Sequence, residues 1–226
     1  DFPAEYIVKR DPNGNWCKWT GSAYQSLITG LNGNVYCMAE APDGKIYVGG
    51  NFTNAGGITT ADYLARWNPV TEAWEAVMGG LNGSVDTMVF DAQGSLYIGG
   101  GVTNAGGNNN ADYIAKIINL GEGQTPSILS LGTGLNSFCN ALVISPEGNL
   151  YAGGNFTTAG GVPANRIAMW DLIGWDSLST GLNKSVFVLT FAPNGNLWIG
   201  GLFTNADGTA GDYLCYWDGT AFRPCW

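Results

Sequence analysis

Apolar residues occur in short runs along the whole chain, and Gly, Asn and Pro separate these runs. In one stretch, apolar runs at 85–90, 96–101, 113–118 and 127–132 are separated by the turn DAQG, the loop TNAGG and a variable loop. Short apolar runs bounded by turn residues are typical of β-strands. The pattern therefore predicts four strands joined in chain order, and it predicts no long helix.

This four-strand pattern recurs around a glycine-pair motif. The stretch YVGGNFTNAGG at 47–57 has close copies at 97–107, 151–161 and 198–208. Repeats of about 50 residues are typical of propellers or solenoids. We therefore expect a single domain over 1–226, with a shortened first unit at 1–29 and full repeats at 30–79, 80–133, 134–180 and 181–226.

A four-stranded sheet with two apolar faces must pack against other sheets. The run VFVLTF at 186–191 is apolar on both sides of the strand, which indicates burial of both faces. We therefore predict an all-β propeller of four-stranded antiparallel blades, with five blades and an irregular first blade. A β-solenoid is the alternative, although its repeats are usually shorter. The first unit could be completed irregularly, be completed by a partner chain, or reflect trimming from a longer protein.

The repeat also has a family resemblance. The series GG-x-F-T, I/L-A-x-W, a Trp in the fourth strand and G-L-N resembles the Kelch-like propeller repeats of microbial cell-surface proteins, and fungal cortical polarity-marker proteins carry a similar series. The resemblance covers residues 30–226 well and 1–29 poorly. It implies a propeller fold and a surface binding or scaffold role, because one fold serves many functions.

Charge limits the classes of partner. Charged residues make up only 12% of the chain and the formal net charge is -9. Such a surface lacks the Lys/Arg footprint that nucleic acid requires, and it is repelled by anionic membranes. The chain begins with Asp1 and has no apolar run near 18 residues, so we expect a processed extracellular, virion-surface or cell-surface protein without membrane insertion.

Catalytic chemistry has few candidate residues. The chain has no His, which removes the commonest general base and metal ligand. The acidic residues Glu40, Asp86, Asp91 and Glu147 occupy unmatched repeat positions. The five Cys residues have no CxxC spacing, so we expect buried thiols, with a Cys17–Cys225 disulfide as the alternative. We expect no enzyme activity, no cofactor and no metal.

Two loop motifs are expected to share one end of the strands. In a four-stranded meander, the GLN segments at 30–33, 80–83, 134–137 and 181–184 emerge at the same end as the TNAGG-type loops. Their polar side chains could bind a ligand or could satisfy the loop backbone. Candidate binding residues on this face are Asn54, Asn82, Asn104, Asn108, Asn109, Asn136, Asn183 and Asn205.

Carboxylates recur just before the third strand of three repeats. Asp62, Asp112 and Asp212 are weak candidates for calcium ligands, because each loop supplies only one carboxylate. Capping of the local backbone is the competing interpretation. The repeats diverge at 58–60, 108–110, 162–163 and 209–210, where we expect specificity to lie.

Together these patterns predict a non-catalytic extracellular binding or adhesion module that recognises a protein or a glycan through the face bearing the GLN and TNAGG motifs. The alternative is a structural surface component of a virion or an extracellular filament, which includes self-assembly or a blade completed by a partner. A glycan-active enzyme is the third hypothesis. The sequence does not identify the ligand, the oligomeric state or the disulfide pairing.

Overall fold

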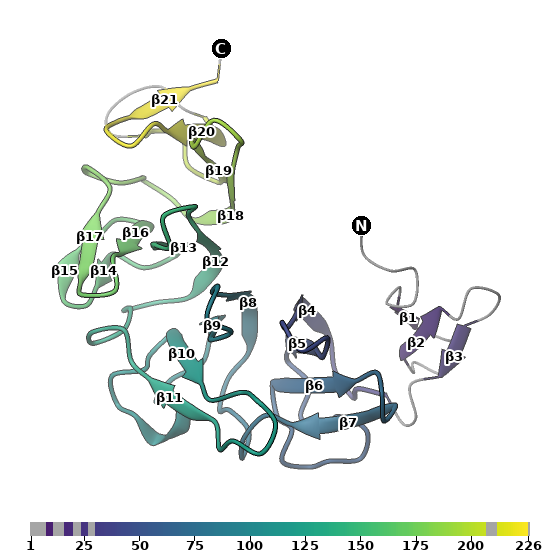
Figure 1. The fold of residues 1–226 in the computed structure, drawn as a ribbon. Coiled ribbons are helices and arrows are strands. Elements are labelled where there is room, and N and C mark those ends of the chain that lie inside the picture. Colours follow the sequence, from purple (N-terminus) through teal and green to yellow (C-terminus); the bar gives the residue numbers. More distant parts are fainter. Residues whose placement is uncertain (1–7, 11–15, 20–23, 27–29, 207–211, 226) are drawn as a thin grey trace. The chain divides into compact units, whose positions relative to one another are not determined.

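The computed structural model describes residues 8–10, 16–19, 24–26, 30–206 and 212–225, with backbone strands alone for the first three ranges. It consists of two compact units, Asp1–Ser84 and Val85–Trp226, which are described separately. Each unit is built from antiparallel sheets (Figure 1). Within the described residues, no helix has the length and apolarity needed to cross a membrane.

The first unit contains two sheets. A three-stranded sheet has the order β1-β2-β3, and a four-stranded sheet has the order β4-β5-β6-β7. The strands are β1 (Val8–Arg10), β2 (Trp16–Trp19), β3 (Tyr24–Ser26), β4 (Val35–Glu40), β5 (Ile46–Gly50), β6 (Leu64–Asn68) and β7 (Ala73–Ala76).

The second unit contains three four-stranded sheets. Their strands are β8 (Val85–Phe90), β9 (Leu96–Gly100), β10 (Ile114–Ile118) and β11 (Ser127–Leu129); β12 (Cys139–Ile144), β13 (Leu150–Gly154), β16 (Ile167–Trp170) and β17 (Trp175–Ser177); and β18 (Val186–Phe191), β19 (Leu197–Gly201), β20 (Leu214–Trp217) and β21 (Phe222–Pro224). A 3-10 turn η2 (Ala105–Gly107) and a small ribbon of β14 (Thr158–Ala159) and β15 (Val162–Pro163) lie in the loops.

The predicted architecture is confirmed strand by strand. In each four-stranded sheet, consecutive strands pair antiparallel with no strand skipped, apart from the small β14–β15 ribbon. The tight turns between the first two strands each place a glycine at positive φ, as at Gly94, where φ is 79° and the amide donates to the Asp91 carbonyl at 3.0 Å. A left-handed residue at this position suits a tight hairpin and disfavours side chains with a Cβ. The fold is thus all-β, with sheets in the form of blades.

Neighbouring blades of the second unit share their cores. One cluster joins Tyr97 and Ile114 of the first blade to Cys139, Leu142 and Trp175 of the second. The other clusters around Val186, Leu197 and Phe222 and includes Ile167 of the preceding blade. Burial of apolar area between the sheets stabilises them at about 25 cal/mol per Å². Each sheet therefore depends on its neighbour for a core.

Aromatic residues that recur in the blades pack in the cores of both units. Trp67 packs edge-on against Trp74 at 5.4 Å, and Trp170 and Trp175 lie 5.5 Å apart. The buried Trp175 Nε1 donates to the Leu131 carbonyl at 2.8 Å. Trp67, Trp74 and Trp175 are buried and offer no stacking platform for a sugar, whereas Trp170 is half-buried.

One prediction about burial is wrong. The run VFVLTF was expected to be buried on both faces, but in β18 the side chains of Phe187 and Val188 are 47% and 58% exposed. Only one face of this strand, with Val186 and Leu189, packs in the core shared with the preceding blade. Among the residues that the structure describes, those on the other face of this strand belong to no such core.

The described cysteines are thiols. Cys139 and Cys215 are fully buried, Cys37 is half-buried and Cys225 is exposed. Burial raises the pKa of the Cys139 thiol far above its usual value, and raises that of Cys215 to about 12. The Cys17 side chain lies outside the described residues.

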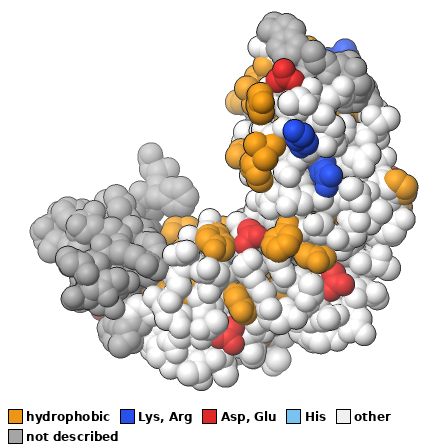
Figure 2. Space-filling view, turned by 180° about the vertical axis from the view of Figure 1, so that it is seen from behind, with side chains coloured by type: hydrophobic (Ala, Val, Ile, Leu, Met, Phe, Trp, Pro, Cys, Tyr) orange, Lys and Arg blue, Asp and Glu red, His pale blue; other side chains and the backbone are white. Residues whose placement is uncertain are grey.

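On the face drawn in Figure 2, charged side chains are sparse, as the composition indicates.

Candidate functional site

The GLN segments and the glycine loops meet at one end of the blades. Leu31 forms a β-bridge with Ala55 in the first unit, and Leu135 and Leu182 form the same bridge with Ala159 and Ala206 in the second. We call the surface that these two motifs form in each unit the loop face. The structure therefore brings together the motifs that the sequence placed at one end of the strands.

An Asn–Thr pair fastens the two motifs together. The Asn136 Nδ2 donates to Thr157 Oγ1 at 2.9 Å, while Asn136 Oδ1 accepts from the amides of Thr157 and Thr158 at 2.8 and 3.0 Å. The pairs Asn32–Thr53 and Asn183–Thr204 repeat this arrangement, with side-chain distances of 3.0 and 3.1 Å. These amides therefore satisfy the backbone and each other, which favours the structural interpretation of the repeated Asn and Thr residues.

We predict that Asn136→Ala lowers the free energy of unfolding by about 1–3 kcal/mol, because three hydrogen bonds of roughly 1 kcal/mol each are lost at a solvent-exposed site. Asn109→Ala is the matched control. Its side chain is exposed on a loop of the same face, so the free energy of unfolding should change by less than about 0.5 kcal/mol. Chemical denaturation measures both variants, and equal losses would contradict the role of the Asn–Thr pair.

The remaining candidate residues are spread over the loops. Asn54 Oδ1 accepts from the Gly57 amide at 2.8 Å, and Asn108 Oδ1 accepts from the Asn110 amide at 3.0 Å. Asn104 adopts a left-handed conformation, and its amide donates to Asp112 Oδ1 at 2.7 Å. Asn82 is exposed. Local backbone contacts thus account for several of these amides.

The aspartates are arranged singly. Asp62 and Asp112 each accept the amide of the following GLN leucine through their backbone carbonyls, at 3.2 and 3.0 Å. Asp212 is exposed. Among the residues that the structure describes, no three His, Cys, Asp or Glu side chains gather in a way that could hold a metal ion. The calcium interpretation gains no support from the geometry of the described loops.

A backbone position in the left-handed region follows each of these aspartates and the equivalent Asn165. Tyr63, Tyr113, Arg166 and Tyr213 all have φ between 62° and 67°, in the left-handed region. The Arg166 amide donates to the Phe156 carbonyl, and the Arg166 carbonyl accepts from the Gly154 amide, each at 2.9 Å. Side chains with a Cβ rarely adopt this conformation. The loop therefore holds one residue per blade in a fixed backbone conformation. Only in the third full repeat is the side chain at this position a cation.

Arg166 lines a pocket on the loop face of the second unit. The pocket has a volume of about 350 Å³, and its polar lining comes from Asn165, Arg166, Thr180, Asn183 and Asn205. Arg166 also donates from its guanidinium to the Asn155 carbonyl. Two predicted binding residues, Asn183 and Asn205, therefore converge here. Sequence reasoning missed Arg166, although it was visible as the one basic residue where three repeats have Tyr.

The positions where the repeats diverge, at which we expect specificity to lie, are found in different places. Val162 and Pro163 form β15, which pairs with β14, and Asn108 follows the turn η2. Thr209 and Ala210 lie outside the described residues. None of the pocket-lining residues is at these positions. The divergent residue that lines the pocket is Arg166, just after the loop.

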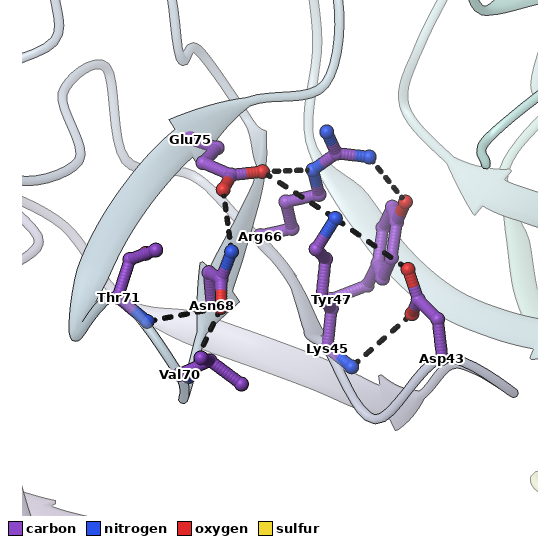
Figure 3. A network of polar contacts seen from close by, with 8 residues as sticks. All are labelled: Asp43, Lys45, Tyr47, Arg66, Asn68, Val70, Thr71 and Glu75. Atoms are coloured by element: carbon purple, nitrogen blue, oxygen red, sulfur yellow. Dashed lines mark hydrogen bonds and ion pairs between the residues drawn. The ribbon is translucent and has the colours of Figure 1, made fainter. Parts of the chain in front are cut away.

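The densest group of charges is structural. In the first unit, Arg66 Nε pairs with Glu75 Oε2 at 2.6 Å and Arg66 donates to the Tyr47 hydroxyl at 3.1 Å (Figure 3). Burial raises the pKa of Tyr47. Burial also works against ionised Glu75, yet hydrogen bonds from Asn68 and Arg66 and nearby positive charge hold its pKa below the usual value. A carboxylate held ionised by its partners is poorly suited to act as a general acid.

Each first strand carries a bulge that the sequence did not reveal. The pairing register shifts at Tyr36, Asp86, Asn140 and Phe187, one in each four-stranded sheet. Asn140 uses its bulge position to donate from Nδ2 to the Val186 carbonyl of the next blade at 2.9 Å. Bulges redirect side chains and often occur near functional sites. The signal in the sequence is that this position varies within an otherwise regular apolar frame.

Comparison with known proteins agrees with the propeller fold. A family model described as the Rax2 C-terminal beta propeller domain matches residues 18–123, slightly less than half of the chain. A comparison with curated proteins found no match. The Kelch-like type remains a prediction.

Solved structures share the fold at low sequence identity. The extracellular domain of BT4673 from B. thetaiotaomicron has a TM-score of 0.53 at 15% identity, over 87% of this chain and 24% of that one. Virginiamycin B lyase from Staphylococcus aureus has a TM-score of 0.53 at 15% identity, over 87% and 56%. PorZ of Porphyromonas gingivalis has a TM-score of 0.57 at 10% identity, over 98% and 33%. The chain thus spans between a quarter and three fifths of the length of these structures, and its fold is that of a β-propeller.

Proposed function

We propose that this chain is a non-catalytic extracellular binding module that takes its ligand at the loop face of the second unit. The observation that carries the proposal is the pocket of about 350 Å³ beside Arg166. Its amides, hydroxyl and guanidinium can donate and accept several hydrogen bonds within a small space, which suits a ligand rich in hydroxyl or carbonyl groups. A glycan or an exposed protein segment has this chemistry.

Three considerations support a binding role over catalysis. The chain has no His, and the most strongly hydrogen-bonded carboxylates, such as Glu75 and Asp91, are held in ion pairs. The lyase neighbour is named as catalytically inactive when a histidine is replaced by alanine, and this chain offers no histidine. Arg166 is fixed by its backbone and by the Asn155 carbonyl, so the pocket is pre-formed.

An extracellular location fits the same proposal. Two of the neighbours are named as an extracellular domain and as a bacterial surface component. The low share of charged residues and the glycine- and asparagine-rich loops agree with that setting. The charge balance argues against nucleic acid as the ligand.

We expect the purified chain to bind at least one component of a broad glycan array or of a panel of surface proteins, and Arg166→Gln to weaken that binding roughly ten- to hundredfold, because a charge-assisted hydrogen bond is lost. Tyr63→Gln is the matched control, since it changes the equivalent residue of another blade and should leave the affinity unchanged. Thermal unfolding of each variant confirms that the fold is intact. No binding across both panels, or equal binding by Arg166→Gln, would contradict the proposal.

A further inference from the structure

The pocket beside Arg166 lies where two blades of the second unit meet, and the same unit contains an equivalent junction for comparison. At the pocket, the Leu182 amide donates to the Asn165 carbonyl at 3.0 Å, so a GLN segment joins the blade that precedes it. One blade earlier, the Leu135 amide donates to the Asp112 carbonyl, also at 3.0 Å. We call these places the pocket junction and the preceding junction. Their backbones are alike, so their side chains can be compared position by position.

Two aromatic side chains lie together at the preceding junction. The ring centroids of Tyr113 and Phe138 are 5.8 Å apart. At the pocket junction, Arg166 replaces Tyr113 and Ser185 replaces Phe138, since the backbone carbonyls of each pair accept from equivalent amides. The pocket junction therefore has no such ring pair, and polar groups line it instead.

Charge also changes at the pocket junction, and always in the same direction. Asn165 replaces the aspartate of the other three full repeats, Arg166 replaces their tyrosine, and Lys184 replaces the glycine or serine that follows GLN in the others. Compared with the preceding junction, one negative charge is absent and two positive charges are present, in a chain whose formal net charge is -9. A local excess of positive charge attracts anions. These changes therefore favour a negatively charged ligand.

No described carboxylate forms an ion pair with either of these two cations. The other described cations of the second unit are held in ion pairs of 2.9 and 2.7 Å, Lys116–Asp91 and Arg223–Asp218. Within the described part of the chain, no Asp or Glu lines the pocket. Arg166 donates to the Asn155 carbonyl, and its guanidinium carries further N–H groups. Arg166 and Lys184 can therefore donate to an anion without breaking an ion pair with a described residue.

The rest of the lining indicates what kind of molecule carries the anion. Among the described residues that line the pocket, Leu182 alone has an apolar side chain, and it is buried. The amides of Asn165 and Asn183 are held in place, because they donate to the Thr180 carbonyl at 2.9 Å and to Thr204 Oγ1 at 3.1 Å. An acidic peptide side chain would need apolar lining for its stem, whereas a sugar presents hydroxyl groups around its whole ring. Polar lining next to two cations therefore suits an acidic sugar.

We propose that the pocket beside Arg166 binds an acidic saccharide, with the anionic group of the sugar held by Arg166 and Lys184 and its hydroxyl groups held by the neighbouring amides. The inference rests on the proposed binding function of the loop face and narrows the ligand to sugars that bear a carboxylate or a sulfate. Both anions accept charge-assisted hydrogen bonds, and a carboxylate can accept two parallel bonds from one guanidinium.

NMR titration of the full 226-residue chain with matched sugars tests the need for charge. The probes are glucuronate, its neutral methyl ester, glucose 6-sulfate and neutral glucose. We expect at least one acidic sugar to bind about tenfold more tightly than its neutral counterpart, because charge-assisted hydrogen bonds are stronger than neutral ones. The preference between the two acidic sugars identifies the anionic group. Affinity for the preferred one should fall as salt is added, since salt screens exposed charges.

Lys184→Gln tests the second cation without changing the part of the lining that Arg166 supplies. Lys184 is exposed, so the variant should fold normally and lose roughly fivefold in affinity for the preferred acidic sugar, with no change for the neutral counterpart. Gln124→Glu is the matched control. It changes the net charge by the same amount at an exposed residue between β10 and β11, at the other end of the strands, and should leave both affinities unchanged.

The outcomes distinguish this inference from the proposed function. Equal affinity for acidic and neutral sugars, with Arg166→Gln still weakening both, would overturn the inference and leave the proposed function intact. Tighter binding of a tetraglutamate peptide than of either acidic sugar, or wild-type affinity in Lys184→Gln, would also overturn the inference alone. No binding of any glycan or surface protein would overturn both.

Discussion

Gly153→Val is expected to lower the free energy of unfolding by about 3 kcal/mol or more, because the new side chain would overlap Val186 of the adjacent blade. A Cβ at this position already lies 2.5 Å from Val186 Cγ1 and 3.0 Å from Val186 Cβ. The residues it meets are in a fully buried cluster, so they can move aside only by disturbing the core between two sheets.

Gly200→Val is the matched control for this substitution. It places the same side chain at the equivalent position of the next blade, where the nearest atom is 3.7 Å from the new Cβ. The free energy of unfolding at low protein concentration should change by less than about 1 kcal/mol, since valine also suits a strand better than glycine. Chemical denaturation of both variants gives the comparison, and a similar loss in the two would show that packing between blades is not the cause.

High pH is expected to destabilise the second unit through its two buried thiols. Cys139 and Cys215 are fully buried, and burial raises the pKa of both, to about 12 for Cys215. Their pKa is higher in the folded chain than in the unfolded chain, so their contribution is fully present below the usual thiol pKa and is lost as the pH rises above it. From pH 9 towards 12, each thiol should reduce the free energy of unfolding by about 1.4 kcal/mol per pH unit.

Variants separate this effect from the titration of tyrosines in the same range. Cys215→Ala should make the decline above pH 9 shallower, whereas Cys225→Ala, at an exposed thiol, should change it less, because burial is the larger cause of the raised Cys215 pKa. The measurement is a denaturation series at increasing pH. A decline with the same slope in Cys215→Ala and wild type would contradict the role of the buried thiol.

The strands and tight turns could be predicted from the sequence because each depends on local pattern. The run at 85–90 coincides with β8, and Gly94 takes the positive φ that its turn requires. The aromatic residues that recur in the blades pack in their cores, since shared packing explains one side chain that recurs in every blade. Their regular spacing carried enough information for the fold.

The sequence could not predict features that depend on contacts between blades. The bulges at Asn140 and Phe187 leave the apolar alternation nearly unchanged, so the sequence marks them only by the varied residue type at this position. The left-handed conformation of Arg166 occurs at a residue type that seldom adopts it, so propensity pointed elsewhere. The exposure of Val188 and Leu214 depends on what lies beside the last sheet, and the apolar pattern alone suggests burial.

The meeting of the two loop motifs at one face was predicted, but the composition of the pocket there was not. The sequence placed the GLN and glycine-loop motifs on one face, and the structure joins them through bridges and Asn–Thr pairs. It brings Asn183 and Asn205 together at one pocket and leaves the other candidate asparagines in separate loops. The repeated residues build the scaffold, and the divergent Arg166 gives this pocket its chemistry.

The account assigns a structural role to the repeated residues and a binding role to Arg166. The most direct test compares Asn136→Ala and Arg166→Gln for both stability and binding of the ligand found on the arrays. The account predicts that Asn136→Ala loses stability while its folded fraction binds as wild type does. It predicts that Arg166→Gln, which gives up one hydrogen bond rather than three, loses less stability than Asn136→Ala but loses affinity. The opposite pattern, with affinity lost in Asn136→Ala and kept in Arg166→Gln, would contradict the account.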